Sequence, residues 1–278
     1  MHGCGPAPTT LTIMPVRVAL LQVSITDDEP VAERIERVLA MTAEVAVDHD
    51  LVVLPELWPI GAFAIDLMPV HAEPLQGPLC RALGQVAAES GAWVFGGSFA
   101  ERVESESGEI DYFNTQVAFG PDGVLAGSYR KVHLFGFNGG ETSVMTSGGE
   151  VVVVEGPLGP TGLATCYDLR FPELFRALVD GGAEAFVIPA GWPERRVAHW
   201  QILARARAIE NQAYVLACNE AGTHGGVPIA GCSMVIDPQG ELLAEAGTGE
   251  EVLSVEIDPD RVAAWRGAFP ALEDRRLG

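Results

Sequence analysis

Residues 161–180 read TGLATCYDLRFPELFRALVD, and this stretch decides the fold more clearly than any other. The run up to Tyr167 is apolar and predicts a strand, while Pro172 suits the first position of a helix that stops at Gly181-Gly182. Cys166 therefore lies at a strand–turn–helix bend. Such a bend exposes a nucleophile and leaves backbone N–H groups free to bind an oxyanion.

The plain alternative for Cys166 is a buried structural cysteine, because cysteine packs as a small hydrophobe. Cys218, in the run YVLACN, serves as an internal control, since it also lies in a predicted strand but no charged motif follows it. Cys166 is followed by Asp168, Arg170 and Glu173, a dense polar run in an otherwise apolar region. This contrast favours a functional role for Cys166.

Apolar runs and helical patterns alternate on both sides of this stretch. The runs LVVLP (51–55) and AFVIPA (185–190) are apolar without alternation, which predicts strands covered on both faces. Helices between strands, together with hairpin turns, predict a layered α/β domain with mixed sheets. Strands are expected at 16–24, 51–57, 93–101, 113–120, 124–134, 151–156, 161–167, 185–190, 214–219, 231–237, 242–247 and 252–258. Helices are expected at 31–47, 79–89, 173–180 and 197–212, the last with Ile202, Leu203, Ala206 and Ile209 on one face.

The chain of 278 residues carries a formal net charge of −21. A surface this acidic repels phosphate backbones and anionic headgroups, so nucleic acid and membranes are poor candidate partners. No apolar run approaches the length that spans a bilayer. Small acidic ligands remain open, because a local arginine can override the overall field.

The cysteines and the termini bear on compartment and domain organisation. Five cysteines, an odd number without paired spacing, predict a reduced, cytoplasmic protein. Residues 1–14 lack the basic and apolar regions of a signal peptide and are interpreted as a flexible leader, with Met14 as an alternative start. Residues 15–278 show no break in composition and predict a single domain.

Three further charged residues are candidates for chemistry. Lys131 is the only lysine among 17 basic residues, and its compact ammonium is not replaced by the planar fork of arginine. Glu141, ten residues later, is a candidate partner. Glu56 ends the predicted strand of LVVLPELW, at the kind of position where α/β proteins place active sites. A surface salt bridge at Lys131 and a solvated glutamate at position 56 are the plain alternatives.

Sequence motifs for nucleotides and metals are missing. The chain has no G-x-x-x-x-G-K-[ST], no helix-opening G-x-G-x-x-G and no C-x-x-C, and its six histidines lack H-x-H or H-E-x-x-H spacing. The sequence therefore predicts no metal and no cofactor. His133 is expected to pack or hydrogen-bond rather than to serve a Cys–His pair.

Three motifs in order, LPELW (54–58), YRKVHLF (129–135) and TCYDLRFPELFR (165–176), resemble the Glu, Lys and Cys motifs of the nitrilase, or carbon–nitrogen hydrolase, superfamily. The similarity continues through RARAIENQAYVLACN and GCSMVIDPQGELLAEAG. The resemblance implies a four-layer α-β-β-α sandwich with two mixed β-sheets. It also implies a homodimer or higher homo-oligomer, with residues 172–180 in the interface.

The same resemblance implies the roles of the candidate residues. Glu56 is the expected general base, Lys131 the oxyanion stabiliser, Cys166 the nucleophile and Glu141 an additional glutamate near the site. Together they would cleave a non-peptide C–N bond of a small amide through a cysteine thioester, releasing ammonia or an amine. The oxyanion is expected between Lys131 and the backbone N–H of Tyr167.

The identity of the substrate is less constrained. The triplet Cys166-Tyr167-Asp168 resembles the amidase branch near ω-amidases and the amidases of deaminated glutathione, whereas true nitrilases usually have Cys-Trp-Glu. Cys232 departs from several of these relatives, which have histidine there. The substrate-binding residues are expected to be Tyr167, Trp192, Phe135 and Phe63. Arg195 and Arg196 either bind a substrate carboxylate or form a solvated loop, and the loop is the favoured interpretation.

Other functions remain as hypotheses at this point. The chain is alternatively an N-carbamoyl amide hydrolase, a nitrilase, an acyltransferase or a catalytically silent member that binds a small molecule. A thiol redox protein using Cys166 is a further alternative, against which stands the lack of a second cysteine nearby in sequence. The presence of all three catalytic residue types argues against a silent member.

Overall fold

The computed structural model describes residues 14–136 and 139–277, so the expected leader, residues 1–14, lies outside the described residues except for Met14. The strands are β1 (Val16–Gln22), β2 (Ser24–Thr26), β3 (Leu51–Val53), β4 (Trp93–Glu104), β5 (Ile110–Phe119), β6 (Leu125–Arg130), β7 (Val153–Val154), β8 (Thr161–Leu163), β9 (Ala185–Ala190), β10 (Tyr214–Asn219), β11 (Ala221–His224), β12 (Val227–Pro228), β13 (Met234–Ile236), β14 (Leu242–Glu245) and β15 (Glu251–Ile257). The α-helices are α1 (Val31–Ala46), α2 (Pro78–Ser90), α3 (Pro172–Asp180), α4 (Val197–Asn211) and α5 (Arg261–Ala268).

Most of the strands form two six-stranded sheets, with the orders β15-β1-β3-β4-β5-β6 and β14-β13-β10-β9-β8-β7. Each sheet has a parallel centre, β1–β3–β4 in one and β8–β9–β10 in the other, flanked by antiparallel pairs. A small third sheet has the order β12-β11-β2. Both large sheets are therefore mixed, as the sequence predicts.

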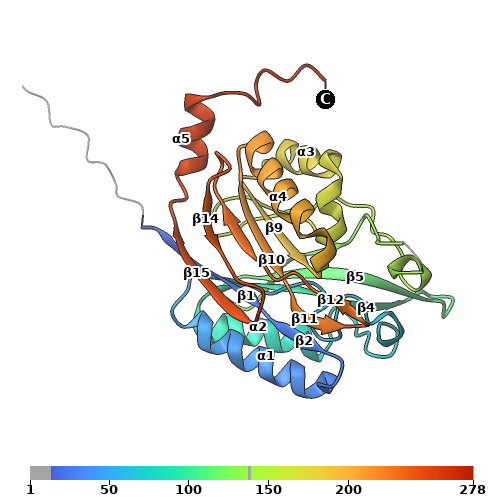
Figure 1. The fold of residues 1–278 in the computed structure, drawn as a ribbon. Coiled ribbons are helices and arrows are strands. Elements are labelled where there is room, and N and C mark those ends of the chain that lie inside the picture. The colour runs from blue at the N-terminus through green and yellow to red at the C-terminus, as the bar shows by residue number, and fades with distance from the viewer. Residues whose placement is uncertain (1–13, 137–138, 278) are drawn as a thin grey trace, which may run out of the picture.

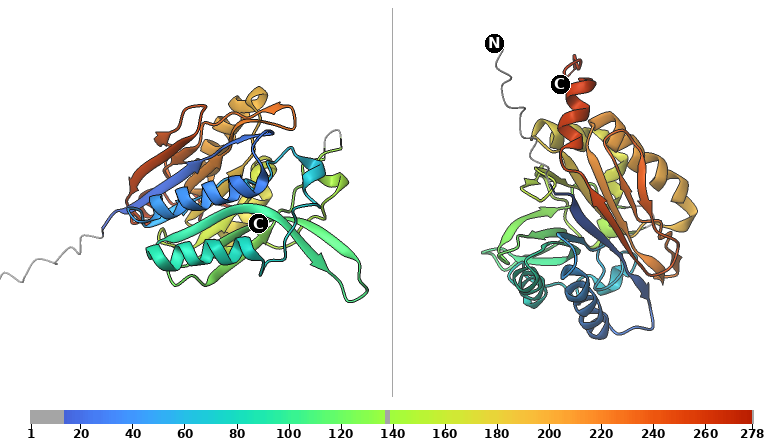
Figure 2. Two further views of the ribbon diagram at one scale, coloured as in Figure 1. Left: turned by 90° about the horizontal axis from the view of Figure 1, so that it is seen from below. Right: turned by 90° about the vertical axis from the view of Figure 1, so that its left-hand side faces the viewer.

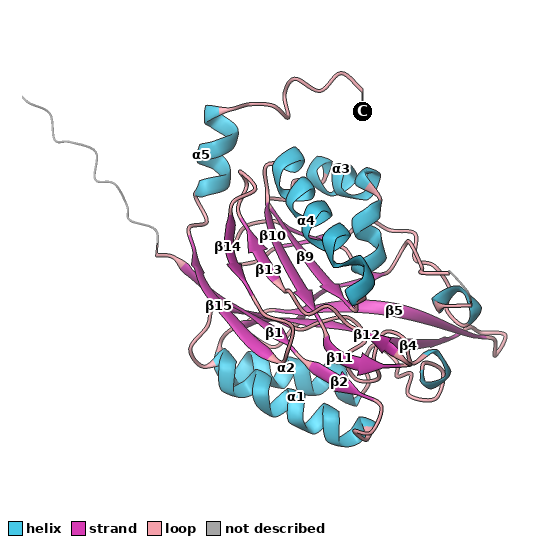
Figure 3. Ribbon diagram, in the orientation of Figure 1, coloured by secondary structure: helices cyan, strands magenta, loops and turns pink. Residues whose placement is uncertain are grey.

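The two large sheets stack face to face between two layers of helices (Figure 1). Helices α1 and α2 cover the outer face of the first sheet, and α3 and α4 cover the second (Figures 1 and 3). The view from below in Figure 2 shows α1 and α2 running side by side across their sheet. The predicted four-layer α-β-β-α sandwich is confirmed.

Strand β1 shows why these apolar runs do not alternate with polar residues. Val18 and Leu20 point into the core between the sheets, while Ala19 and Leu21 point into the core that Val38 of α1 completes. All five side chains are fully buried. A strand covered on both faces needs apolar residues on both, and β1 meets that need from Val18 to Leu21. Towards its ends, Arg17 is exposed and the buried Gln22 donates to the carbonyls of Gly247 and Gly249.

Helix α4 differs from its sequence pattern. The pattern placed Ile202 and Ile209 on an apolar face, but these side chains are 65% and 53% exposed. The buried side instead consists of Trp200, Ala204, Arg207, Ala208 and Asn211. The small residues Ala204 and Ala208 allow the helix to approach the sheet closely, and this tertiary fit outweighs the hydrophobic periodicity.

Several predicted strands are shorter than their apolar runs. The run 51–57 contains only β3 (Leu51–Val53), 151–156 only β7 (Val153–Val154), 161–167 only β8 (Thr161–Leu163) and 231–237 only β13 (Met234–Ile236). Glu56 consequently lies in the turn beyond β3 rather than on the strand itself. In the part of the chain that the structure describes, no helix has the length and apolar character needed to cross a membrane.

Candidate active site

Three charged side chains meet below the mouth of a cavity, although they come from distant parts of the chain. The Nζ atom of Lys131 donates to Oε1 of Glu56 at 2.7 Å and to Oε2 of Glu141 at 2.6 Å. The exposed fractions are 1% for Lys131, 1% for Glu56 and 3% for Glu141. Since an isolated buried charge is very costly, these groups are stable in this place only as mutual partners.

The sheet and one loop bring this cluster together. Glu56 follows β3 and Lys131 follows β6, and both strands belong to the first sheet. The Lys131 N–H donates to the carbonyl of Asn114 at 2.9 Å, which continues the β5–β6 ladder. Glu141 opens a short 3-10 turn, and its Oε2 accepts the backbone N–H of Phe135 at 2.8 Å. The loop after Lys131 therefore folds back over its own ammonium group.

Asn114 also belongs to the cluster, although the sequence did not predict it. Its Nδ2 donates to Glu56 at 2.8 Å and to Glu141 at 2.7 Å, and its side chain is fully buried on β5. A single amide thereby spaces the two carboxylates and fixes their orientation. The only local signal was a polar residue within an apolar run, which is costly to bury unless it finds partners.

Cys166 occupies a left-handed turn, with φ at 47°. It is the first residue of the 3-10 helix η3 (Cys166–Arg170), which links β8 to α3, and it is 8% exposed. A positive φ is uncommon for a residue with a side chain and costs conformational energy, so neighbouring contacts must hold it. The bend predicted from the sequence is present at this residue.

Asp168 provides those contacts. Its carboxylate accepts the Thr165 N–H at 2.9 Å, the Tyr129 hydroxyl at 2.8 Å and the His133 N–H at 2.9 Å. The ring of His133 also hydrogen-bonds Asp168, at 2.7 Å, and stacks on Phe171. His133 thus supports the turn that carries Cys166 and links it to the loop that carries Lys131.

The electrostatics of the cluster follow from burial and proximity. Burial and the neighbouring carboxylate of Glu56 raise the pKa of the Cys166 thiol, and the charge of Lys131 opposes this rise. Burial alone lowers the pKa of Lys131, but the carboxylates of Glu141 and Glu56 outweigh it and raise the pKa well above its usual value. The lysine is therefore a stable cation beside a thiol that is protonated at neutral pH.

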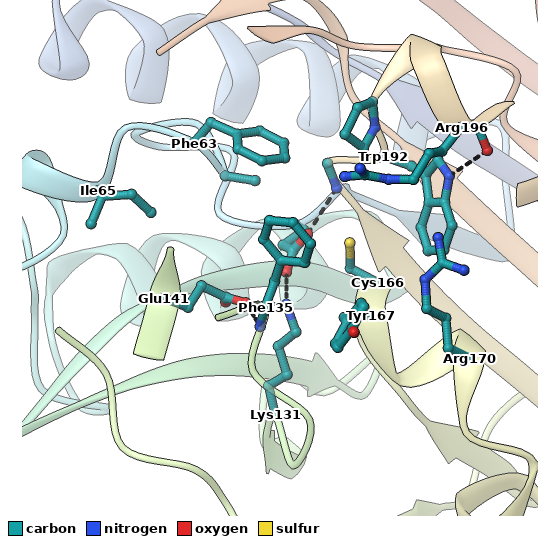
Figure 4. A pocket seen from close by; sticks show the side chains of 14 residues that line it. Phe63, Ile65, Lys131, Phe135, Glu141, Cys166, Tyr167, Arg170, Trp192 and Arg196 are labelled. Carbon is teal, nitrogen blue, oxygen red and sulfur yellow. Dashed lines mark hydrogen bonds and ion pairs between the residues drawn. The ribbon is translucent and has the colours of Figure 1, made fainter. Parts of the chain in front are cut away.

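A cavity opens onto the cluster, with about 440 Å³ of empty space that includes open solvent. Glu56, Lys131, Glu141 and Cys166 line it, and so do the four residues expected to bind substrate, Phe63, Phe135, Tyr167 and Trp192. Figure 4 shows the sulfur of Cys166 facing the space between the rings of Phe135 and Trp192. The structure therefore brings all eight predicted site residues together.

Two arginines contribute to the same cavity, Arg170 and Arg196, whereas Arg195 is exposed outside it. The guanidinium of Arg170 lies 4.8 Å from the ring centre of Trp192, and that of Arg196 lies 5.4 Å from that of Phe135. Within the described residues, neither guanidinium forms an ion pair with a carboxylate. Arg196 therefore lines the cavity and differs from the solvated loop that the sequence favoured. Arg195 is exposed, as expected for such a loop.

The pKa of Arg196 reflects this setting. Burial lowers it, and the like charges of Arg195 and Arg170 lower it further. An anion between the two cavity arginines would relieve that repulsion. Across residues 14–136 and 139–277, no three histidine, cysteine or acidic side chains are grouped so as to hold a metal ion. The prediction of no metal or cofactor stays a prediction.

Comparison with known proteins places this geometry in a family. The family model described as "Carbon-nitrogen hydrolase" matches residues 17–267. The chain belongs to the carbon–nitrogen hydrolase family. The predicted membership of the superfamily, and of an enzyme class that acts on non-peptide C–N bonds, is confirmed.

Relatives of this carbon–nitrogen hydrolase are named as amidases. It is 42% identical to a "2-oxoglutaramate amidase" of Paenarthrobacter nicotinovorans over 93% of this chain and 89% of the relative. It is 32% identical to human "Omega-amidase NIT2" over 94% of this chain and 95% of the relative. The crystal structure of Saccharomyces cerevisiae Nit3, described as a member of branch 10 of the nitrilase superfamily, matches with a TM-score of 0.84 and 29% identity over 98% of this chain and 100% of that one. These relatives confirm the predicted likeness to the ω-amidase branch.

Proposed function

We propose that this carbon–nitrogen hydrolase releases ammonia from the terminal amide of a small molecule that carries a carboxylate at its other end. The observation behind this proposal is one cavity that contains Cys166, the Lys131 cluster and two arginines without a carboxylate partner. The relatives named 2-oxoglutaramate amidase and omega-amidase support it, because 2-oxoglutaramate is an amide of this kind.

The reaction begins at the thiol. Glu56 accepts the proton of Cys166 as the sulfur attacks the amide carbon, since the thiolate and not the thiol is the nucleophile. The tetrahedral intermediate collapses when Glu56 returns that proton to the nitrogen, and ammonia leaves a thioester on Cys166. Glu56 then takes a proton from water, the resulting hydroxide attacks the thioester, and the carboxylic acid departs as the thiol is reprotonated.

Lys131 is suited to the negative charge that develops on the carbonyl oxygen. An ammonium has three donors, and Glu56 and Glu141 engage two of them. The third is free for the oxyanion, together with the backbone N–H of Tyr167. Such a preorganised donor contributes about 3–4 kcal/mol to transition-state stabilisation. Glu141 keeps Lys131 charged and in place throughout the cycle.

Arg170 and Arg196 are suited to bind the carboxylate of the substrate. Two guanidiniums with converging charge bind a carboxylate through charge-assisted hydrogen bonds. The acidity of the chain as a whole, with a net charge of −21, makes this local positive patch the place where a small anion is favoured. Phe63, Phe135 and Trp192 would cover the carbon chain between the two ends of the substrate.

We also propose a homodimer or higher homo-oligomer, a cytoplasmic location and one catalytic domain over residues 15–278. The exposed Ile202 and Ile209 of α4, beside α3, are apolar surface suited to an interface between copies. Sedimentation of the purified protein tests the assembly. A monomer at micromolar concentration would contradict it.

Ammonia release from a panel of compounds tests the function. The panel contains 2-oxoglutaramate, succinamate, propionamide, a nitrile and an N-carbamoyl amino acid, each measured with the wild type and with Cys166→Ala. We expect Cys166-dependent ammonia from the two carboxylate-bearing amides and little from propionamide. Faster turnover of the nitrile or the carbamoyl compound would assign another branch, and thioester formation without hydrolysis would indicate an acyltransferase.

A further inference from the structure

Behind the cavity lies a second buried acid–base pair that the proposed reaction does not use. Oε2 of Glu220 and Nε2 of His224 are 2.7 Å apart, and both residues are fully buried. Glu220 follows β10 and His224 ends β11. Replacing such a pair by apolar residues of similar size is often neutral or even stabilising, so the pair is poorly explained by stability alone.

The hydrogen bonds fix the proton on this histidine. The backbone N–H of Phe63 points to Nδ1 of His224 at 3.4 Å, and an N–H can only donate. Nδ1 must therefore be the acceptor, so the proton lies on Nε2 and is donated to Glu220. His224 thus joins the backbone of Phe63 to a buried carboxylate.

This imidazole is packed tightly against one wall of the cavity. The wall is the segment 61–65, of which Ala62, Phe63 and Ile65 line the cavity. A Cβ at Gly61 would come within 2.8 Å of the His224 ring, and the φ of Gly61, +93°, already favours glycine. A Cβ on Gly191 would approach both Ala62 and Glu220, so this carboxylate lies close to the same wall. Burial raises the pKa of Glu220, and His224 opposes the rise.

The other side of Glu220 faces Gly191, whose N–H donates to Oε2 of Glu56 at 2.8 Å. A Cβ on Gly191 would lie 2.7 Å from Oε2 of Glu220. The strand end at Gly191 does not depend on the Glu220 side chain, because β9 pairs with β10 and the Glu220 N–H donates to the Ala190 carbonyl at 2.9 Å. Removing the side chain should therefore loosen the wall and leave Glu56 oriented.

We propose that Glu220 and His224 are positioning residues for substrate binding, which anchor the wall 61–65 to the end of β9 through their hydrogen bond. Neither touches the reacting atoms. Their loss is expected to raise KM and to leave kcat nearly unchanged, since the wall contacts the body of the substrate and the chemistry occurs at Cys166.

The test uses a double variant, Glu220→Leu with His224→Phe, so that neither side chain of the pair is left buried without the other. Glu220→Gln is the conservative variant, because its side-chain oxygen still accepts from His224 Nε2. Cys218→Ala, on β10 two residues before Glu220 but facing the other sheet, controls for a general loss of stability. The readouts are kcat and KM for the amide that the wild type turns over, and hydrogen exchange of the peptide covering residues 58–67.

In the double variant we expect KM to rise roughly tenfold, as for the loss of about 1.4 kcal/mol of binding, with kcat within about twofold. Exchange of 58–67 should accelerate in that variant alone, while Glu220→Gln and Cys218→Ala stay close to the wild type. Unchanged exchange and an unchanged KM in the double variant would overturn the proposal. A Glu220→Gln protein with the same raised KM and faster exchange as the double variant would also overturn it. The exchange comparison needs no substrate, so an incorrect substrate assignment shows in the wild-type assay and leaves this test intact.

Discussion

Cys166 and Cys218 are both buried beside the second sheet, yet only one of them is arranged to react. Cys166 is 8% exposed and faces the cavity, whereas Cys218 is fully buried between the sheets. The Sγ of Cys218 lies 3.4 Å from the carbonyls of Leu21 and Val53, either of which can accept its single proton. Burial raises the pKa of both thiols. A carboxylate raises the pKa of each thiol further, Glu56 at Cys166 and Glu220 at Cys218, but only Cys166 has a cation, Lys131, that opposes the rise.

The backbone makes the difference between the two cysteines. Cys218 continues a regular strand, whereas Cys166 has a φ of 47° and turns its sulfur away from the sheet toward Glu56 and Lys131. The strained turn therefore brings the Cys166 thiol to Glu56 and Lys131, which the regular strand does not do for Cys218. Exposure distinguishes the two only slightly.

The largest expected effect is that of Cys166→Ala. Without the sulfur no thioester forms, so ammonia release should fall roughly 10⁴- to 10⁶-fold. Circular dichroism should show an unchanged fold. Cys218→Ala is the matched control and should keep wild-type turnover. If the two variants lost activity equally, the contrast between these cysteines would be wrong.

Lys131→Arg tests whether any cation at this position supports turnover or whether the compact ammonium group is needed. The guanidinium still pairs with Glu56 and Glu141, so the protein should fold, but its planar fork displaces the donor from the oxyanion. We expect kcat to drop about 10²- to 10³-fold. Steady-state kinetics with 2-oxoglutaramate measure this, and a kcat near that of the wild type would mean that Lys131 acts only as a counter-ion.

Arg196→Gln separates substrate binding from chemistry at Cys166. A hydrogen bond to a charged group contributes about 1.5–3 kcal/mol, so KM for a carboxylate-bearing amide should rise roughly 10- to 100-fold. Turnover of propionamide, which has no carboxylate, should not change. Equal effects on both amides would exclude a carboxylate contact at Arg196.

The pH dependence of alkylation is expected to differ between the two thiols. Because the pKa of Cys166 lies above its usual value of 9.0, the free enzyme holds a thiol at neutral pH, and the thiolate fraction grows as pH rises. The rate of Cys166 labelling by iodoacetamide should climb by up to about tenfold per pH unit and not level off below pH 9. Mass spectrometry should find Cys218 unlabelled until the protein unfolds. A plateau near pH 7 would mean that Lys131 already stabilises the thiolate.

The smallest effect concerns stability. Cys218→Ala leaves a small gap between the sheets, and its free energy of unfolding should fall by about 1 kcal/mol, with a Tm lower by a few degrees. The kinetic constants should stay unchanged. Thermal melts followed by circular dichroism check this, and a shift in KM would show that the core between the sheets communicates with the cavity.

Much of this architecture was predictable, because some signals are local. The bend at Cys166, the unique Lys131 and the helix that begins at Pro172 are all visible in a few consecutive residues. Asn114 and the Glu220–His224 pair were not, since each gains its meaning from strand register and from residues far away in the chain. The packed face of α4 was not predicted for a related reason. The helix lies close to the sheet, so its buried face has alanines, while Ile202 and Ile209 are exposed.

Lys131 also gives the protein an unusual chemical property. It is the chain's only lysine, and it is 1% exposed beneath the cavity. Amine-directed cross-linkers, dyes and immobilising resins therefore find no accessible lysine on the folded protein, and the ε-amine becomes available only when the cluster of Lys131, Glu56 and Glu141 opens. The extent to which such reagents modify Lys131 therefore reports whether the site is intact.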